Sequence, residues 1–326
     1  MPKEYCHWVM AEKIKQILPP SPIKNIIQKN INLYRLGAVI PDSPLYHIPW
    51  KKREKFQNTA PRLHGNQGEN TLSFIPSTVR HYGLKMNSRI WAFLSGIVTH
   101  IATDSQYHPL VFYFCGNQNS HNPQISQGAV YRHRRWETNL DLFYMQNFPL
   151  PHNPKVDSLF RNMEMGPLEF FKLVHFYYFQ NQPIRLKAVI QTLNWHRFLQ
   201  KFFSIKNFFH FFDILNQFPS VYLDDFLALF YFPRKEIPAS FHQKIIKYQH
   251  PVTGEPQAKS LKNIEDRVVE KAAVTLSIID RSLSNKHPER KVEQLKGPSL
   301  STGLDNSSIE EMIHFKIKPP DTLFNI

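Results

Sequence analysis

The 326-residue sequence predicts an all-α protein, and three observations support this prediction. Apolar residues recur at helical spacing in most segments, clusters of proline, glycine and asparagine separate those segments, and almost no stretch alternates as a strand does. Hydrophobic residues make up 42% of the chain, which is enough to fill a sizeable core. The chain is therefore expected to fold as a multi-helix bundle.

The apolar periodicity places the first helix at residues 2–18, where a cluster of prolines ends the pattern. A central helix is expected at 87–106, and the apolar run "HPLVFYF" continues or restarts it. The remaining segments with helical periodicity are 23–37, 69–83, 128–147, 165–181, 183–203, 206–217, 221–231, 262–284 and 308–316. Ser307 and Glu310 have the spacing of a capping box, which predicts the start of the last helix.

Three segments lack sustained periodicity. The stretch from "AVIPDSP" to "HGNQGENT" is rich in Pro, Gly and Asn, so it predicts a long loop of the kind that often carries function. "YQHPVTGEPQAKS" predicts a turn or boundary, and "SNKHPERKVEQLKGPSLSTGLDNSS" predicts a flexible linker. Within "FLQKFFSIKNFFHFFDIL", a narrow polar stripe of Gln200, Ser204, Asn207 and His210 favours a core helix over one that dips into a membrane.

The formal net charge of +14 suits a nucleic-acid backbone, an anionic membrane surface or a phosphate-bearing substrate, and it does not choose among them. The amino terminus lacks the pattern of a secretory signal. The most apolar long stretch, 91–115, contains polar residues that would be costly inside a membrane. A soluble, cytoplasmic chain without a transmembrane segment is expected. Cys6 and Cys115 do not imply a disulfide framework and are expected to be small buried residues.

Two helical stripes carry side chains that can hold a metal. Because four residues advance a helix by 400°, His100, Asp104 and His108 lie on one face of the central helix. His133 and Glu137 are also four residues apart on a predicted helix. Imidazole nitrogens and carboxylate oxygens are ligands for zinc, although one such pair alone more often forms a surface hydrogen bond.

Three further candidates stand where a helix or loop could deliver a polar group to an interior site: His7, Asp42 in "GAVIPDSP" and His64 in "RLHGNQGE". Each also has an ordinary interpretation. His7 could be a core histidine, Asp42 a turn residue between prolines, and His64 a loop histidine before Gly65.

Taken in order, "HW", "PD", "HG", "HxxxDxxxH" and "HxxxE" occur within the first 137 residues. With the stretches "EYCHWVMAEK", "LYRLGAVIPDSPLY", "WAFLSGIVTHIATDSQYHPLVFYF" and "YRHRRWETNLD", this set resembles the zinc-dependent phospholipase C family. The resemblance covers about residues 1–150. The wider clan also includes zinc nucleases that act on single strands.

The resemblance implies a mostly helical phospholipase C-like bundle around two to three zinc ions. It implies a metal-binding core at 1–150, to which we add a helical extension at 151–250 packed on the core. Residues 251–326 would then supply a helix, the flexible linker and a short terminal helix.

The ligand sets follow from the same resemblance. It assigns the first ion to Asp42, His64, His100 and Asp104, and the second to His108, His133 and Glu137. His7 would contribute to a third ion, with Asp104 as the bridge between the first and the third. A carboxylate suits that position because its two oxygens can hold two cations that would otherwise repel each other.

For the reaction, the resemblance implies hydrolysis of a phospholipid to diacylglycerol and a phosphorylated head group. Asp42 is the first candidate for accepting the proton of the attacking water, and Glu69 is the second. Arg132, Arg134 and Arg135 could attract anionic lipid surfaces or form a solvated helix face. Two alternatives stay open: a nuclease or other phosphodiesterase, and a non-catalytic scaffold stabilised by metal.

Overall fold

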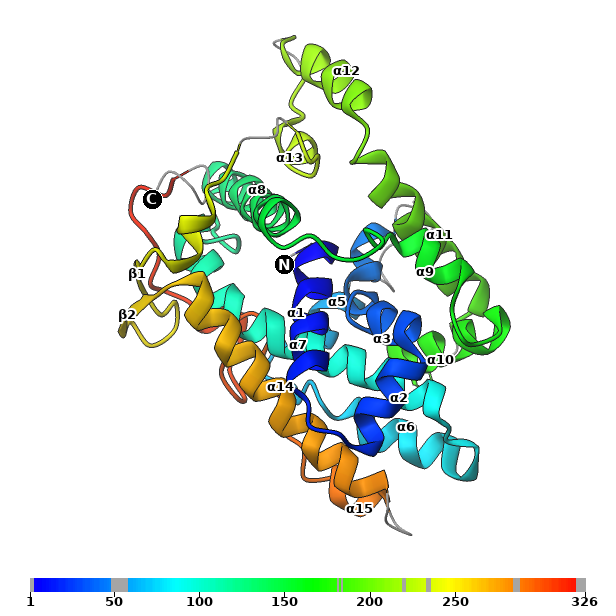
Figure 1. The fold of residues 1–326 in the computed structure, drawn as a ribbon. Helices are drawn as coiled ribbons and strands as arrows, with labels where there is room; N and C mark the ends of the chain where they lie inside the picture. Colours follow the sequence, from blue (N-terminus) through cyan, green and yellow to red (C-terminus); the bar gives the residue numbers. More distant parts are fainter. Residues whose placement is uncertain are drawn as a thin grey trace.

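Helices dominate the structure, which confirms the predicted all-α class (Figure 1). The computed structural model describes residues 3–47, 58–180, 182, 184–218, 221–232, 236–283 and 288–320. Its helices and single-turn elements are α1 (Glu4–Ile17), α2 (Pro22–Lys29), α3 (Ile31–Gly37), η1 (Ile40–Tyr46), α5 (Thr59–Leu63), α6 (Phe74–Tyr82), η3 (Gly83–Lys85), α7 (Ser88–Cys115), α8 (Pro123–Asn147), α9 (Val156–Arg161), α10 (Pro167–Phe179), α11 (Leu186–Phe202), α12 (Lys206–Asn216), α13 (Asp224–Leu227), η4 (Ala239–Gln243), α14 (Leu261–Leu283), α15 (Pro288–Val292) and η5 (Ile309–Glu311).

Several predicted boundaries shift. The central helix α7 continues through Pro109 to Cys115, so the run "HPLVFYF" extends it. The segment predicted as one helix at 23–37 is divided at Asn30 into α2 and α3. The predicted helix at 308–316 shrinks to the single turn η5, whose capping box is formed by Ser308 and Glu311, one residue after the predicted pair.

Two segments that the sequence predicted to be irregular or flexible have a defined structure. The polar stretch after residue 245 forms an antiparallel hairpin of β1 (Ile246–Gln249) and β2 (Pro256–Lys259), with Ile246 opposite Lys259. The predicted flexible linker packs tightly where it is described, because Val292, Leu295 and Leu300 are buried. A linker prediction based on polar composition misses these isolated apolar anchors.

One main hydrophobic core runs from Tyr5 to Leu300 and draws on all three predicted parts of the chain. In Figure 1, α7 lies behind α1 and α14, and it also contacts α2, α3 and α8. Cys6 and Cys115 are free and buried, as expected. Among the described helices, none combines the length and hydropathy needed to cross a membrane.

A smaller second core lies beneath α11, α12 and α13. Its buried members are Leu199, Phe203, Phe209, Leu227 and Phe230. On α12 only Phe209 is buried, so the prediction of a core helix is wrong for this part of the phenylalanine-rich run. Figure 1 shows α12 at the upper edge of the molecule, far from α7.

The central helix approaches α3 so closely that only glycine fits at the crossing. A Cβ atom added to Gly96 would lie 2.1 Å from the carbonyl oxygen of Tyr34, and one added to Gly37 would lie 2.2 Å from that of Phe93. Both obstacles are backbone atoms, which cannot move aside as a flexible side chain can. This close contact fixes the position of α7 against the segment that leads into η1.

We expect Gly96→Ala to destabilise the fold by about 1–3 kcal/mol, because the two helix backbones must separate to admit the methyl group. The ~1 kcal/mol that alanine gains over glycine in a helix offsets only part of this cost. The free energy of unfolding in denaturant measures the effect. Gly166→Ala is the control, because nothing lies within 4 Å of the added Cβ atom; equal stability of the two variants would contradict the close-crossing argument.

Candidate metal centre

Three of the predicted ligands lie on one stripe of α7. Asn87 starts this helix by accepting hydrogen bonds from the backbone N–H groups of Arg89 and Ile90. The helix is apolar around most of its circumference, which buries it. His100, Asp104 and His108 are therefore buried as well, and their polar atoms must be satisfied inside the protein.

The first donor group consists of Asp42, His64, His100 and Asp104, whose ligand atoms all lie within 4.8 Å of one another. They come from three separate segments: η1, the residue after α5, and α7. His64 Nε2 lies 3.1 Å from Asp42 Oδ1, and His100 Nε2 lies 3.2 Å from Asp104 Oδ2. The structure thus brings together the four residues assigned to the first ion.

Backbone carbonyls fix the orientation of three histidines. The Nδ1–H group of His64 donates to Ala60 O at 2.6 Å, that of His100 to Ala38 O at 2.9 Å, and that of His108 to Leu300 O at 2.8 Å. Because a carbonyl only accepts, Nδ1 carries a proton in each ring, and Nε2 is the nitrogen left to face the donor groups. Metal-binding histidines are typically oriented in this way.

The donor atoms fit a divalent cation. His100 Nε2 and both carboxylate oxygens of Asp104 are buried, and they make no hydrogen bond to any residue that the structure describes. Nitrogen lone pairs and anionic oxygens at these distances repel each other unless a positive charge lies between them. Two imidazoles and two carboxylates form a donor set that suits zinc.

His7, on α1, adjoins this group from the other side of Asp104. Its ring stacks on His100 with centroids 4.3 Å apart, and its Nε2 lies 3.3 Å from Asp104 Oδ1. Asp104 therefore directs one oxygen toward His7 and the other toward His100. This arrangement suits a carboxylate shared between two positions.

The second donor group consists of His108, His133 and Glu137, whose ligand atoms also lie within 4.8 Å of one another. His108 comes from α7, and the other two come from successive turns of α8. His133 Nε2 lies 2.6 Å from Glu137 Oε1, and the rings of His108 and His133 are 5.8 Å apart. Since His108 follows Asp104 by one helical turn, the two groups adjoin each other.

The pKa shifts place these residues in their metal-binding protonation states. Burial alone would raise the pKa of Asp104, but His100, His108 and His7 hold it well below its ordinary value. Burial lowers the pKa of His108 to about 3 and that of His133 well below its ordinary value. At neutral pH the carboxylate is thus ionised and both imidazoles are neutral.

Sequence reasoning missed Asp141, which positions α1 against α8. Its buried carboxylate accepts hydrogen bonds from the backbone N–H groups of Tyr5 at 3.0 Å and Cys6 at 2.8 Å. These N–H groups belong to the first turn of α1, where a helix favours negative charge. The spacing of His133, Glu137 and Asp141, four residues apart, was the available signal.

A second unpredicted chain of hydrogen bonds supports Asp42. Ser43, the next residue on η1, bonds through Oγ to His196 Nδ1 at 2.7 Å. His196 Nε2 in turn lies 2.9 Å from Glu4 Oε1. All three residues are buried, so a chain of polar side-chain contacts joins η1, α11 and α1 beside the first group.

The segment around Leu300 contacts both donor groups. Its N–H donates to the carbonyl oxygen of His64 at 2.8 Å, and its own carbonyl accepts from His108. A turn closed by the Gly303 N–H to Ser299 O bond, 2.8 Å long, holds Leu300 in place. The region predicted as a flexible linker therefore orients two of the candidate ligands.

Four other residues considered from the sequence lie outside the donor groups. Glu69 accepts a hydrogen bond from the backbone N–H of Gln67 at 2.9 Å and lines a separate cavity of about 760 Å³. The arginines of α8 are half-buried and donate to backbone carbonyls: Arg132 to Cys115, Arg134 to Asp225 and Arg135 to Phe232. These contacts fix neighbouring segments, so the three arginines do not form the solvated face considered from the sequence.

Gly303→Ala should weaken zinc binding by about 10–100-fold, the usual effect of disturbing residues that orient metal ligands. The backbone at Gly303 has φ +73°, and an added Cβ atom would lie 2.4 Å from the carbonyl oxygen of Ser105. The turn must then shift and take Leu300 away from His64 and His108. Competition with a chromogenic chelator measures the affinity, again with Gly166→Ala as the control. Unchanged affinity in Gly303→Ala would show that the Leu300 segment does not support the centre.

Comparison with known proteins identifies the family of the chain. The family model of zinc-dependent phospholipase C matches residues 6–204, which is more than half of the chain and extends beyond the predicted limit at residue 150. Searches among curated proteins and solved structures find no match. The matched range includes every residue of both donor groups as well as His7. The chain belongs to the zinc-dependent phospholipase C family.

Proposed function

We propose that this chain is a phospholipase C-type enzyme that hydrolyses a phospholipid to diacylglycerol and a phosphorylated head group. The observation that carries the proposal is the pair of adjoining donor groups, joined by Asp104 and His108 on one helix. We assign two to three zinc ions to them. The first group would hold one ion, the second another, and His7 with Asp104 a third.

The composition of the second group favours catalysis over a purely structural role. Structural zinc sites are normally closed by four protein ligands, whereas catalytic sites use three and leave a position for water or substrate. His108, His133 and Glu137 supply three. This favours an enzyme over the metal-stabilised scaffold.

Zinc, when bound, would lower the pKa of water and offset negative charge on the phosphate group. Asp42 is the residue we assign to accept the proton of the attacking water. Its side chain keeps 11% exposure, whereas that of Asp104 is fully buried, so Asp42 is the carboxylate of the first group that solvent can reach. The bond from Ser43 to His196 beside it fixes its position on η1.

Glu69 remains the second candidate for this role. It follows His64 by five residues, but its carboxylate accepts a hydrogen bond from the Gln67 N–H group. It also lines the cavity bounded by Arg62 and Asn66 rather than the donor groups. A substrate in that cavity would be needed for Glu69 to act, so Asp42 is preferred.

We expect Asp104→Asn to lower both zinc content and turnover, with turnover falling by about a hundredfold or more. The amide keeps the size of the side chain but has one neutral oxygen, so it cannot hold two cations as a carboxylate does. Elemental analysis should find two to three zinc ions in the unmodified protein and fewer in the variant. Equal zinc content in both would require a new ligand assignment.

His47→Ala is the matched control for this experiment. His47 lies on the same loop as Asp42, but its Nδ1 bonds to Thr192 Oγ1 at 2.7 Å and it belongs to neither donor group. Zinc content and turnover should stay near those of the unmodified protein. A loss equal to that in Asp104→Asn would mean that the assay reports general damage to the fold.

The identity of the product tests the reaction itself. Incubation with phosphatidylcholine should release diacylglycerol and phosphocholine, because C-type cleavage breaks the bond on the glycerol side of the phosphate. Phosphatidic acid would indicate D-type cleavage instead, and mononucleotides from single-stranded nucleic acid would indicate a nuclease. A fully zinc-loaded protein that produces none of these would be a scaffold.

A further inference from the structure

Helix α12 exposes an apolar face that no other residue described by the structure covers. Phe208, Phe211 and Ile214 recur every three residues and share one side of α12, and Phe218 follows in the turn after the helix; we call these four residues the aromatic face. All four are exposed, and Phe211 and Ile214 reach 56% and 58%. The opposite side of α12 packs Phe209 into the second core.

Stacked rings connect the aromatic face to α11. The rings of Phe208 and Phe202 are 4.6 Å apart, and Phe202 stacks on the exposed Phe198 at 5.9 Å. Val221 and Tyr222, beyond α12, are also exposed. A helix that is apolar on both its packed and its solvent side is typical of one whose second side meets another apolar phase.

Positively charged side chains lie beside the aromatic face, as they do in proteins that bind a membrane surface. The three lysines Lys155, Lys201 and Lys206 are exposed near the start of α12, where long side chains can reach lipid phosphates. The acidic groups nearby have contacts of their own, and Asp157 pairs with Lys201. Asp224 accepts a hydrogen bond from Asn216 at 2.8 Å, and Asp213 lies about 160° around the helix from the centre of the aromatic face.

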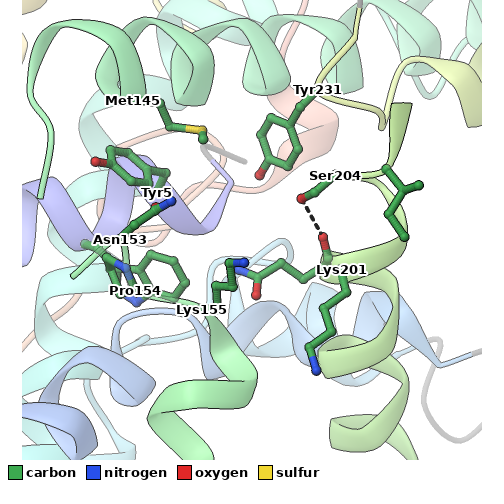
Figure 2. Close-up of a pocket in the computed structure, with 11 residues that line it drawn as sticks. Tyr5, Met145, Asn153, Pro154, Lys155, Lys201, Ser204 and Tyr231 are labelled. Atoms are coloured by element: carbon green, nitrogen blue, oxygen red, sulfur yellow. Dashed lines mark hydrogen bonds between the residues drawn. The ribbon is translucent and has the colours of Figure 1, made fainter. Parts of the chain in front are cut away.

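A cavity of about 400 Å³ opens beside the same end of α11 (Figure 2). Ser204 and Ile205, which lead into α12, line it, and Figure 2 shows Lys155, Lys201, Tyr5 and Tyr231 around it. Lys201 is held by Asp157 at 2.7 Å. The aromatic face thus adjoins a pocket lined by aromatic rings and by Lys155, with Lys201 at its edge.

The aromatic face is also attached to elements that carry the donor groups. Thr138 of α8 donates to Ala228 O at 2.8 Å and Arg134 donates to Asp225 O at 3.0 Å, so the α13 region is fixed to the turns that hold His133 and Glu137. Tyr46, at the end of η1, packs against the second core. The face therefore has a rigid connection to both α8 and η1.

We propose that the aromatic face of α12, with the lysines at its start, docks this protein on the surface of a phospholipid bilayer. The phenylalanine and isoleucine side chains enter the boundary between head groups and acyl chains, and the lysines remain at the level of the phosphates. The proposal rests on the proposed function in one respect, because a phospholipase must reach a substrate that lies in a bilayer.

The test compares two double variants of the full-length, zinc-loaded protein. Phe211→Ser with Ile214→Ser removes the centre of the aromatic face. Leu168→Ser with Val274→Ser removes two apolar side chains of matching exposure, 58% and 57%, on α10 and α14. Sedimentation with sucrose-loaded vesicles of phosphatidylcholine and phosphatidylserine should show about tenfold weaker partitioning for the first variant and no change for the second. Circular dichroism and thermal unfolding establish that both variants are folded.

Turnover on two substrates, one in vesicles and one soluble in water, distinguishes a loss of docking from a loss of catalysis. The ratio of turnover on vesicles to turnover on a water-soluble short-chain phosphatidylcholine should fall about tenfold in the first variant only. Vesicle binding by the unmodified protein without hydrolysis of either lipid would overturn the proposed function and leave the docking proposal standing. Equal partitioning of the two double variants would overturn the docking proposal. So would light scattering that shows a dimer lost in the first variant without any vesicle binding, since a second copy would then cover the face.

Discussion

The structure depends on one buried carboxylate that contacts nitrogens from three directions. Asp104 sits fully buried between His7 on one side and His100 with His64 on the other. A buried anion without compensation would cost several kcal/mol, and a cation held between Asp104 and these nitrogens would remove that cost. The helices α1 and α7 and the loop after α5 each bring one histidine to this point.

Main-chain carbonyls fix the orientation of three of the histidine rings. Ala38, Ala60 and Leu300 each accept one Nδ1–H group, and they belong to three segments far apart in the chain. A carbonyl at the end of a helix or in a turn is fixed by the backbone around it, so the imidazole it holds has little freedom. The site is thus rigid because its outer contacts are made by the fold itself, including the segment after α15.

The ligands were more predictable from the sequence than the structure around them. His100, Asp104 and His108 could be recognised because a helix converts a spacing of four residues into one face, and the same rule applies to His133 and Glu137. Asp42 and His64 came only from the order of motifs, since no local rule places two loop residues beside a helix. Leu300 could not be found at all, because a backbone carbonyl contributes the same atom in every residue type.

The helices were predictable in kind but less so in length. Strong apolar periodicity identified α7 and α14, whereas local breaks such as the one at Asn30 depend on tertiary contacts. The error on α12 has a physical cause. A helix with apolar residues on most of its surface has the same sequence pattern whether protein or another apolar phase covers its outer side.

The division into two cores explains how this chain can expose such a helix. The main core holds α7 and the donor groups, while α12 rests on a separate small cluster around Phe203, Phe209 and Phe230. Because those rings anchor only its inner side, the outer side can remain apolar without opening a path from solvent into the main core. Hydrogen bonds from α8, which packs in the main core, to the α13 region hold the second core against the main one. The chain can therefore keep an exposed apolar surface over the second core and a buried cluster of metal-binding side chains in the main core.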